Sequence, residues 1–128
     1  MSMGRTRAAF TLIELIVVMA IVALLLALAA PRYFRSIERA KEATLKQDLN
    51  VMRDALDKFY SDAGRYPDAL DELVARRYLR RIPSDPMTER ADTWQTLPPP
   101  RDATRGLVYN IRSGADGRAL DGTPYSEW

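Results

Sequence analysis

Residues 10–31 read FTLIELIVVMAIVALLLALAAP, and the rest of the chain has to be arranged around this stretch. Glu14 is its only charged residue, and no other charged or strongly polar residue appears from Leu15 to Ala30. A helix needs roughly 17–25 apolar residues to cross the hydrocarbon core of a bilayer, and this run is long enough. A charged side chain inside such a span is costly, so its presence indicates a functional role for Glu14.

Taken alone, the apolar run allows three interpretations: a membrane-spanning helix of a larger element, a plain membrane anchor, or a secretory signal peptide. Arg5 and Arg7 could form the basic start of a signal peptide, and Ala27-Leu28-Ala29 resembles a cleavage site. Cleavage there would leave Pro31 almost at the new terminus, which is a poor context. Basic residues flank both ends of the run, so the positive-inside rule does not decide its orientation.

The residues after the apolar run favour a helix that continues far beyond it. Apolar residues recur at spacings of four and three, which places them on one helical face: Leu45, Leu49, Met52, Leu56 and Phe59. Pro31 can bend a helix without ending it. We therefore predict one helix from Thr11 to about Asp62, on the order of 75–80 Å long at 1.5 Å per residue. A signal peptide does not continue into the mature protein in this way.

Composition excludes several classes of function. The 128 residues include no histidine and no cysteine, which removes histidine-based acid–base catalysis, thiolate chemistry, disulfides and zinc sites with histidine ligands. The net charge is only +2 although 28% of the residues are charged, and basic and acidic residues are interspersed. No concentrated basic stripe indicates a nucleic-acid partner. We therefore predict that the protein is not an enzyme and does not bind nucleic acid.

Over residues 9–31 the chain resembles the type IV pilin-like family. A short basic leader, residues 1–9, precedes the run that starts at Phe10. The resemblance implies that a membrane-embedded prepilin peptidase cuts between Ala9 and Phe10 and then methylates the new amino group of Phe10. Glu14 and Pro31 become the fifth and twenty-second residues of the mature chain, where the family has the same residues. The family usually has glycine in place of Ala9, and we expect processing to persist with alanine.

The resemblance also divides the chain into a leader (1–9), a transmembrane and filament-core segment (10–31) and a periplasmic domain (32–128). It assigns Phe10, Glu14 and Pro31 to assembly. The Glu14 carboxylate would pair with the Phe10 amine of a neighbouring subunit, which neutralises both charges and specifies the register between subunits. The alternative is a glutamate that extends toward the lipid headgroups.

The domain after the long helix is expected to be small and of the α+β class. Gly64 supplies a left-handed cap for the long helix, and Pro67 prevents its continuation. Asp68 can cap a second helix, residues 69–79. Three apolar residues of that helix are expected to face inward: Leu70, Leu73 and Val74.

Two later segments have the composition of strands. Residues 92–97 alternate before a run of three prolines, and residues 107–112 form the clearer strand. Alternation in the second strand predicts Leu107, Tyr109 and Ile111 on one face and Val108 on the other. We expect a small antiparallel sheet of two or three strands packed against the long helix, a type IV pilin-like arrangement.

The Gly-Arg-Tyr-Pro turn at 64–67 and the segment Ile-Pro-Ser-Asp-Pro at 82–86 resemble the major pseudopilin of type II secretion. That family binds calcium in a loop near the carboxyl terminus. Asp116 and Asp121 match its two aspartates by position, with a shorter spacing, and carboxylates are suitable calcium ligands. The alternative is that both belong to ordinary Asp-Gly turns.

The resemblance implies that the protein is a structural subunit of a secretion pseudopilus. It would wait in the bacterial inner membrane as a single-pass protein with its carboxy-terminal domain in the periplasm. Its expected partners are further copies of itself, minor pseudopilins, the prepilin peptidase, an inner-membrane assembly platform and, before assembly, membrane lipid. One alternative is a type IV pilus subunit for adhesion, motility or DNA uptake. Another is a membrane-tethered periplasmic enzyme or binding domain.

Overall fold

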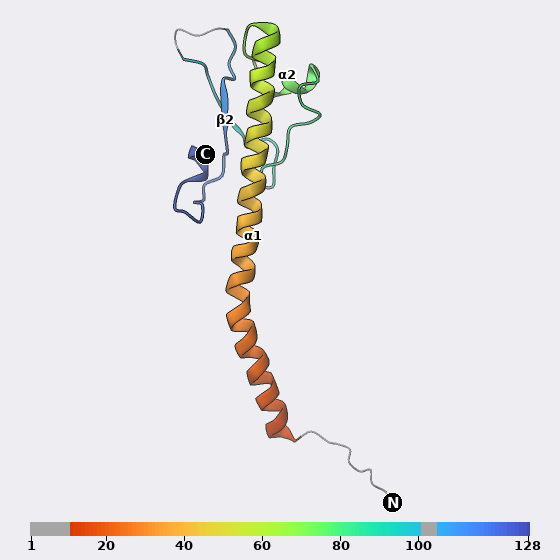
Figure 1. Ribbon diagram of the computed structural model, residues 1–128, viewed down its shortest axis with the longest axis vertical. Coiled ribbons are helices and arrows are strands. Elements are labelled where there is room, and N and C mark those ends of the chain that lie inside the picture. Colours follow the sequence, from red (N-terminus) through yellow and green to blue (C-terminus); the bar gives the residue numbers. More distant parts are fainter. Residues whose placement is uncertain (1–10, 101–104) are drawn as a thin grey trace, which may run out of the picture. The chain divides into compact units, whose positions relative to one another are not determined.

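The computed structural model describes residues 11–100 and 105–128. Its elements follow the order α1 (Leu12–Ala63), α2 (Leu70–Ala75), β1 (Gln95–Leu97), β2 (Asn110–Arg112) and the short 3-10 helix η2 (Tyr125–Glu127) (Figure 1). The chain divides into two compact units, residues 1–37 and 38–128, and α1 contributes to both. A long helix, a short helix and a two-stranded sheet confirm the predicted α+β class and its type IV pilin-like character.

Helix α1 confirms the predicted long helix almost to the residue. It includes Pro31 without interruption and has 52 residues. Gly64 follows it in the left-handed conformation, with φ at 71°, and the Gly64 N–H donates to the Tyr60 carbonyl oxygen at 2.9 Å. This is the left-handed helix end that glycine favours, as the sequence predicted.

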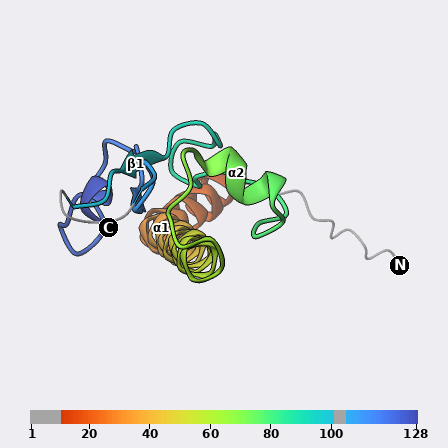
Figure 2. The same cartoon turned by 90° about the horizontal axis from the view of Figure 1, so that it is seen from above.

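The core of the second unit lies along the apolar face of α1. All five residues predicted for that face are buried. The residues that pack around them come from α2, the sheet and the loops, and include Leu73, Trp94, Val108, Ile111 and Tyr125. Figures 1 and 2 show α2 and the sheet at separate positions around this half of α1.

Helix α2 is shorter than predicted and is capped differently. It ends at Ala75 because the chain closes a Schellman turn there: Tyr78 N–H bonds the Leu73 carbonyl oxygen at 2.8 Å, and Arg77 N–H bonds that of Val74 at 3.1 Å. Arg77 takes the left-handed conformation, with φ at 66°. The predicted inward face holds, since Leu73 is buried and Leu70 and Val74 pack against the core.

The prediction that Asp68 caps α2 was wrong. The N-cap residue is Ala69, and no side chain caps the helix. Instead, the Glu72 carboxylate accepts a hydrogen bond from the Asp68 backbone N–H and a bidentate pair of bonds from Arg65. Glu72 thereby joins the turn after α1 to the first turn of α2, and it satisfies the N–H of Asp68, which precedes the N-cap residue.

The sheet is antiparallel and two-stranded, with Thr96 opposite Ile111. Both strands are shorter than predicted, and the predicted faces of the second were wrong in part: Val108 and Ile111 are buried, whereas Leu107 and Tyr109 are exposed. Regular pairing begins only at Asn110. Before it, the Leu107 and Val108 N–H groups both bond the Pro67 carbonyl oxygen, so the chain does not alternate as a strand there.

Candidate functional site

The start of α1 is held by Thr11, which precedes the first helical residue. Its Oγ1 accepts a hydrogen bond from the Glu14 backbone N–H at 3.1 Å, and its carbonyl oxygen accepts one from Leu15. Thr11 is therefore an N-cap, and Glu14 lies three residues further, in the first turn. A carboxylate at this place also interacts favourably with the positive end of the helix dipole. The Thr-x-x-Glu pattern could have indicated this cap from the sequence.

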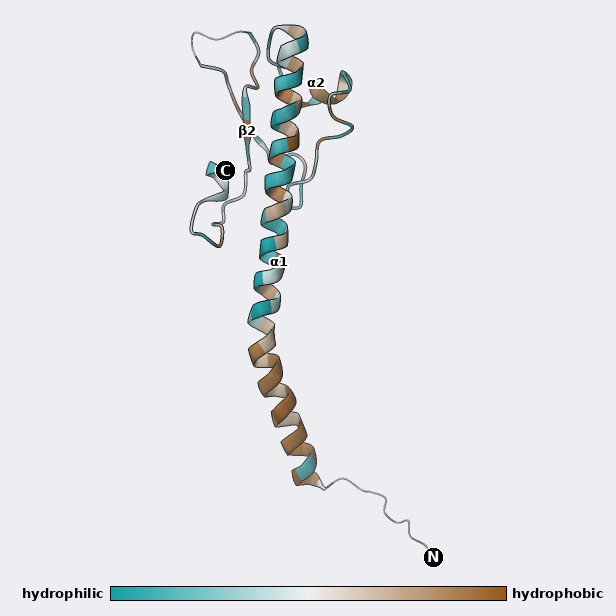
Figure 3. Cartoon of the chain, in the orientation of Figure 1, coloured by the Kyte–Doolittle hydropathy of each residue, from teal (hydrophilic) through white to brown (hydrophobic). Residues whose placement is uncertain are grey.

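The first unit exposes nearly all of its apolar side chains. The large hydrophobic residues of α1 from Leu12 to Leu28 are between 46% and 75% exposed. Figure 3 shows this half of α1 as continuously hydrophobic apart from the first turn, where Glu14 lies. By length and composition, α1 is the one helix in the described part of the chain that could cross a membrane. An apolar surface of this extent requires lipid or protein around it.

The residues assigned to processing lie outside the described part of the chain. Ala9 and Phe10 precede Thr11, so the structure tests neither the cleavage site nor the pairing of the Phe10 amine with Glu14. Pro31 lies inside α1, and the helix continues through it although proline lacks the backbone N–H that would donate a hydrogen bond.

In the second unit, Arg53 of α1 joins three separate parts of the chain. Its Nε donates to Asn110 Oδ1 at 2.9 Å, and its Nη2 donates to the main-chain oxygens of Ile111 at 2.9 Å and Trp128 at 2.5 Å. A guanidinium can serve several acceptors at once because its donors form a planar fork. Arg53 therefore holds β2 and the carboxy-terminal segment against α1.

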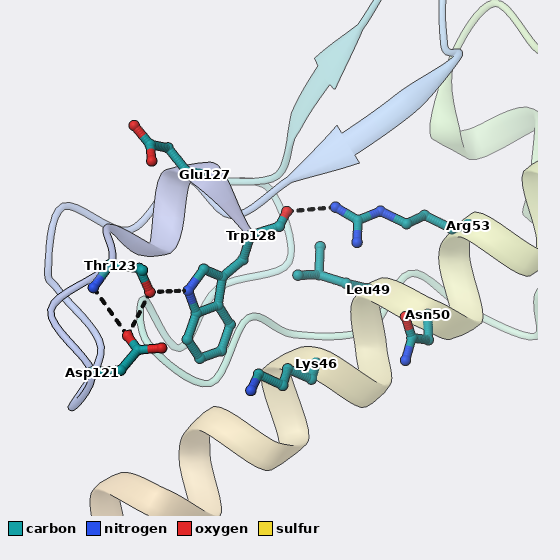
Figure 4. A pocket seen from close by; sticks show the side chains of 8 residues that line it. All are labelled: Lys46, Leu49, Asn50, Arg53, Asp121, Thr123, Glu127 and Trp128. Carbon is teal, nitrogen blue, oxygen red and sulfur yellow. Dashed lines mark hydrogen bonds between the residues drawn. The ribbon is translucent and has the colours of Figure 1, made fainter.

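A pocket of about 470 Å³ opens beside Arg53, between α1 and the carboxy-terminal segment. Figure 4 shows its eight lining residues: Lys46, Leu49, Asn50, Arg53, Asp121, Thr123, Glu127 and Trp128. Lys46 places its Nζ over the Trp128 ring, 4.7 Å from the centroid. The lining combines two cations, two carboxylates, one hydroxyl and one indole.

The loop that carries the two predicted calcium ligands is joined to α1 by one carboxylate. Glu42 Oε1 accepts a hydrogen bond from the Leu120 N–H at 2.8 Å and another from the Tyr125 hydroxyl at 3.0 Å. Tyr125 is 4% exposed. Burial, and secondly the bond to Glu42, raise the pKa of Tyr125 to about 12.

Asp116 and Asp121 are both exposed, and they do not form a ready cation site. Within residues 11–100 and 105–128, no three acidic, histidine or cysteine side chains come together to hold a metal ion. Asp121 Oδ1 already accepts bonds from the Thr123 N–H and hydroxyl, and the Gly122 carbonyl oxygen accepts one from Arg118. The residue types suit calcium, but the loop oxygens as arranged do not fit it.

Asp85 is a buried carboxylate that the sequence did not predict, although it belongs to the Ile-Pro-Ser-Asp-Pro segment at 82–86. Its side chain is fully buried, and it accepts bonds from the Ser113 hydroxyl at 2.5 Å and the Met87 N–H at 2.8 Å. Nearby, burial raises the pKa of Asp48, and the charge of Asp85 raises it further. Asp85 joins the segment after α2 to the end of β2, which is a structural role.

Comparison with known proteins agrees with these features. A family model described as the prokaryotic N-terminal methylation motif matches residues 4–30. The chain is 31% identical to the type II secretion system core protein G of Pseudomonas aeruginosa, over 89% of this chain and 87% of that protein. It is 28% identical to the protein of the same name from Aeromonas hydrophila, over 97% of this chain and 94% of that protein.

A third relative is matched over a shorter stretch. The type IV major pilin protein PilA of Myxococcus xanthus is 38% identical over 64 residues, which cover 50% of this chain and 29% of that protein. No solved structure matches this one.

Proposed function

The chain belongs to the family of type II secretion system core protein G and is a structural subunit of a secretion pseudopilus, and we propose that it acts by polymerising after its leader is removed. The observation that carries the proposal is the two-part character of α1. Its first part exposes apolar side chains along its whole surface, while its second part contributes buried side chains to the core of a folded domain. A helix of this kind can lie in lipid before assembly and against other copies afterwards.

Processing is proposed at the bond between Ala9 and Phe10, with methylation of the Phe10 amine. The match of residues 4–30 to the N-terminal methylation motif supports this. Sequencing the mature amino terminus tests it: a chain that starts at methylated Phe10 is expected, and one that starts at Met1 or Ala30 would contradict it.

Glu14 is proposed to set the axial step between subunits. The Thr11 cap holds Glu14 in the first turn of α1, and Glu14 follows Phe10 by four residues in the sequence. The surrounding side chains are apolar, so both charges gain from meeting an opposite charge. The partner amine belongs to a neighbouring copy in this proposal.

The second unit is proposed to serve as a rigid body without catalysis. The relatives it resembles are structural pseudopilins. Two polar side chains that α1 directs at the other segments, Glu42 and Arg53, are occupied in holding the fold together. We assign no substrate to the pocket beside Trp128.

Among the residues that the structure describes, one helix is apolar and long enough to cross a membrane, and it fits a single-pass membrane anchor. We place residues 10–31 in the inner membrane before assembly and residues 32–128 in the periplasm. The proposed partners are other copies of the chain, minor pseudopilins, the prepilin peptidase and the inner-membrane assembly platform. Calcium binding by Asp116 and Asp121, which the family resemblance implies, would require the ion to replace the hydrogen bonds between Asp121 and Thr123.

Deleting the gene and comparing the exported proteins with the surface pili tests the function. Loss of export with intact pili supports the secretion subunit. Loss of pili with intact export would instead support a type IV pilus subunit, the alternative that the similarity to PilA favours over half of the chain. Complementation with the unaltered gene should restore export.

A further inference from the structure

The loop from Ser113 to Thr123 is closed by contacts among its own side chains and those of α1. We propose that these contacts take the place of a metal ion, so that the carboxy-terminal segment keeps its fold without calcium. The proposal departs from the calcium site that the family resemblance implies. It rests on the occupation of the loop oxygens, on the cations beside them and on the ties to α1.

The first observation is a continuous chain of hydrogen bonds that ends at Asp121. Trp128 Nε1 donates to Thr123 Oγ1 at 2.8 Å, and Thr123 Oγ1 donates in turn to Asp121 Oδ1 at 2.6 Å (Figure 4). The Thr123 backbone N–H donates to the same Oδ1 at 3.0 Å. Asp121 Oδ1, which a calcium ion at this place would bind, therefore already accepts two hydrogen bonds from Thr123 at the end of the loop.

Three further carbonyl oxygens of the loop are engaged as well. Gly117 accepts from the Tyr125 N–H at 3.1 Å, Ala119 from the Gly122 N–H at 2.9 Å, and Thr123 from the Ala119 N–H at 2.7 Å. Calcium binds six to eight oxygens at 2.3–2.6 Å, and it usually recruits several carbonyls from such a loop. Filling that shell here would require breaking bonds that close the loop.

Two cationic side chains, Arg118 and Lys46, lie close to the oxygens of the loop. Arg118 Nη1 donates to the Gly122 carbonyl oxygen at 2.9 Å. The hydrogen bonds from Thr123 hold the pKa of Asp121 below its usual value, and the charge of Lys46 lowers it further. The negative charge of Asp121 thus already has a positive neighbour, and a second cation nearby would be repelled.

Helix α1 supplies the anchorage that an ion would otherwise give. Glu42 holds both Leu120 and the buried Tyr125 hydroxyl through one oxygen. Arg53 holds the main-chain oxygen of Trp128. The loop is therefore tied down at both of its sides by residues about three helical turns apart on α1.

Thermal unfolding of the full processed chain in detergent micelles tests the proposal. The melting temperature is compared in excess calcium, in the same buffer with EGTA, and with magnesium as a control for ionic strength. An ion that binds only the folded chain stabilises it by RT ln(1 + [L]/Kd), so the melting temperature rises with the ion concentration. We expect the calcium and EGTA curves to coincide, and a rise that calcium produces and magnesium does not would overturn the proposal.

Matched variants separate the two accounts. Asp121→Ala removes both bonds from Thr123, and Thr123→Val removes the hydroxyl bond to Asp121 together with the acceptor of Trp128 Nε1. Each variant should therefore melt lower than the unaltered chain, by an amount that does not depend on calcium. Asp116→Ala is the control: its carboxylate is exposed, so the variant should melt like the unaltered chain. If Asp116→Ala and Asp121→Ala instead abolish a calcium-dependent rise together, the loop is an ion site. Failure of the proposed polymerisation would leave these melting curves unaffected.

Discussion

Arg53 and Trp128 are 75 residues apart in the chain, yet the Arg53 guanidinium donates to the Trp128 main-chain oxygen at 2.5 Å. The same side chain reaches Asn110 and Ile111. Replacing it leaves these acceptors without their donor. A hydrogen bond to a charged group contributes roughly 1.5–3 kcal/mol, so Arg53→Met should lower the free energy of unfolding by about 2–4 kcal/mol.

Thermal unfolding followed by near-ultraviolet circular dichroism measures this loss. Arg53→Lys should recover only part of it, because one ammonium group cannot reproduce the planar fork. Arg80→Met is the matched control, since Arg80 is exposed and should tolerate the change within about 0.5 kcal/mol. Equal melting temperatures for Arg53→Met and Arg80→Met would contradict the assigned role.

Tyr125 should make the fold sensitive to alkali. Its pKa is raised from the usual 10.0 to about 12 by burial and by Glu42. Below pH 10 the phenol is protonated in both the folded and the unfolded chain, so its contribution is fully present. Between pH 10 and 12 the unfolded chain loses the proton first, and the free energy of unfolding falls by roughly 2–3 kcal/mol.

The Tyr125→Phe variant isolates this contribution. It cannot ionise, although it also loses the bond to Glu42 and so starts less stable by about 1 kcal/mol. Melting temperatures of both proteins from pH 8 to 12 should therefore converge or cross as the pH rises. A constant difference between them over that range would show that Tyr125 does not titrate as described.

Arg77 has a strained backbone conformation, which would cost glycine no free energy of folding. It occupies the left-handed position of the Schellman turn after α2, with φ at 66°. A side chain there costs about 1 kcal/mol, so Arg77→Gly should stabilise the domain by roughly 0.5–1 kcal/mol. The reverse change tests the same physics: Gly64→Ala should destabilise by a similar amount, because a Cβ at Gly64 meets no atom within 4 Å and only the strain remains.

The melting temperatures of both variants check this pair. A shift of 1 kcal/mol corresponds to roughly 4–8 °C for a domain of this size. If Arg77→Gly melts below the unaltered chain, the arginine side chain makes a contribution that outweighs its strain.

These two helix ends also show what the sequence could predict. The end of α1 was predictable because Gly64 is the residue that a left-handed position favours, and the long apolar periodicity is a local signal. The end of α2 was not, because arginine is not a residue that the left-handed position favours, and the turn is closed there by the backbone bonds of Arg77 and Tyr78. Glu42 and Arg53 were missed for a related reason: both act on residues more than fifty positions away, and no local pattern marks them.

Glu14 provides the test of assembly. Glu14→Ala removes the carboxylate but leaves the apolar run intact, so membrane insertion and removal of the leader should persist. Loss of an interaction of about 1.4 kcal/mol reduces an association constant about tenfold. Because each added subunit would lose this interaction, we expect the yield of sheared filaments to fall by at least that factor, and export to fall with it.

Glu38→Ala on the same helix is the control, since that residue lies beyond the apolar run and should leave the filament yield unchanged. Glu14→Gln separates charge from size: if the pairing is ionic, it should behave like the alanine variant. An unaltered filament yield in Glu14→Ala would instead assign Glu14 to the membrane surface, where its carboxylate would extend toward the headgroups.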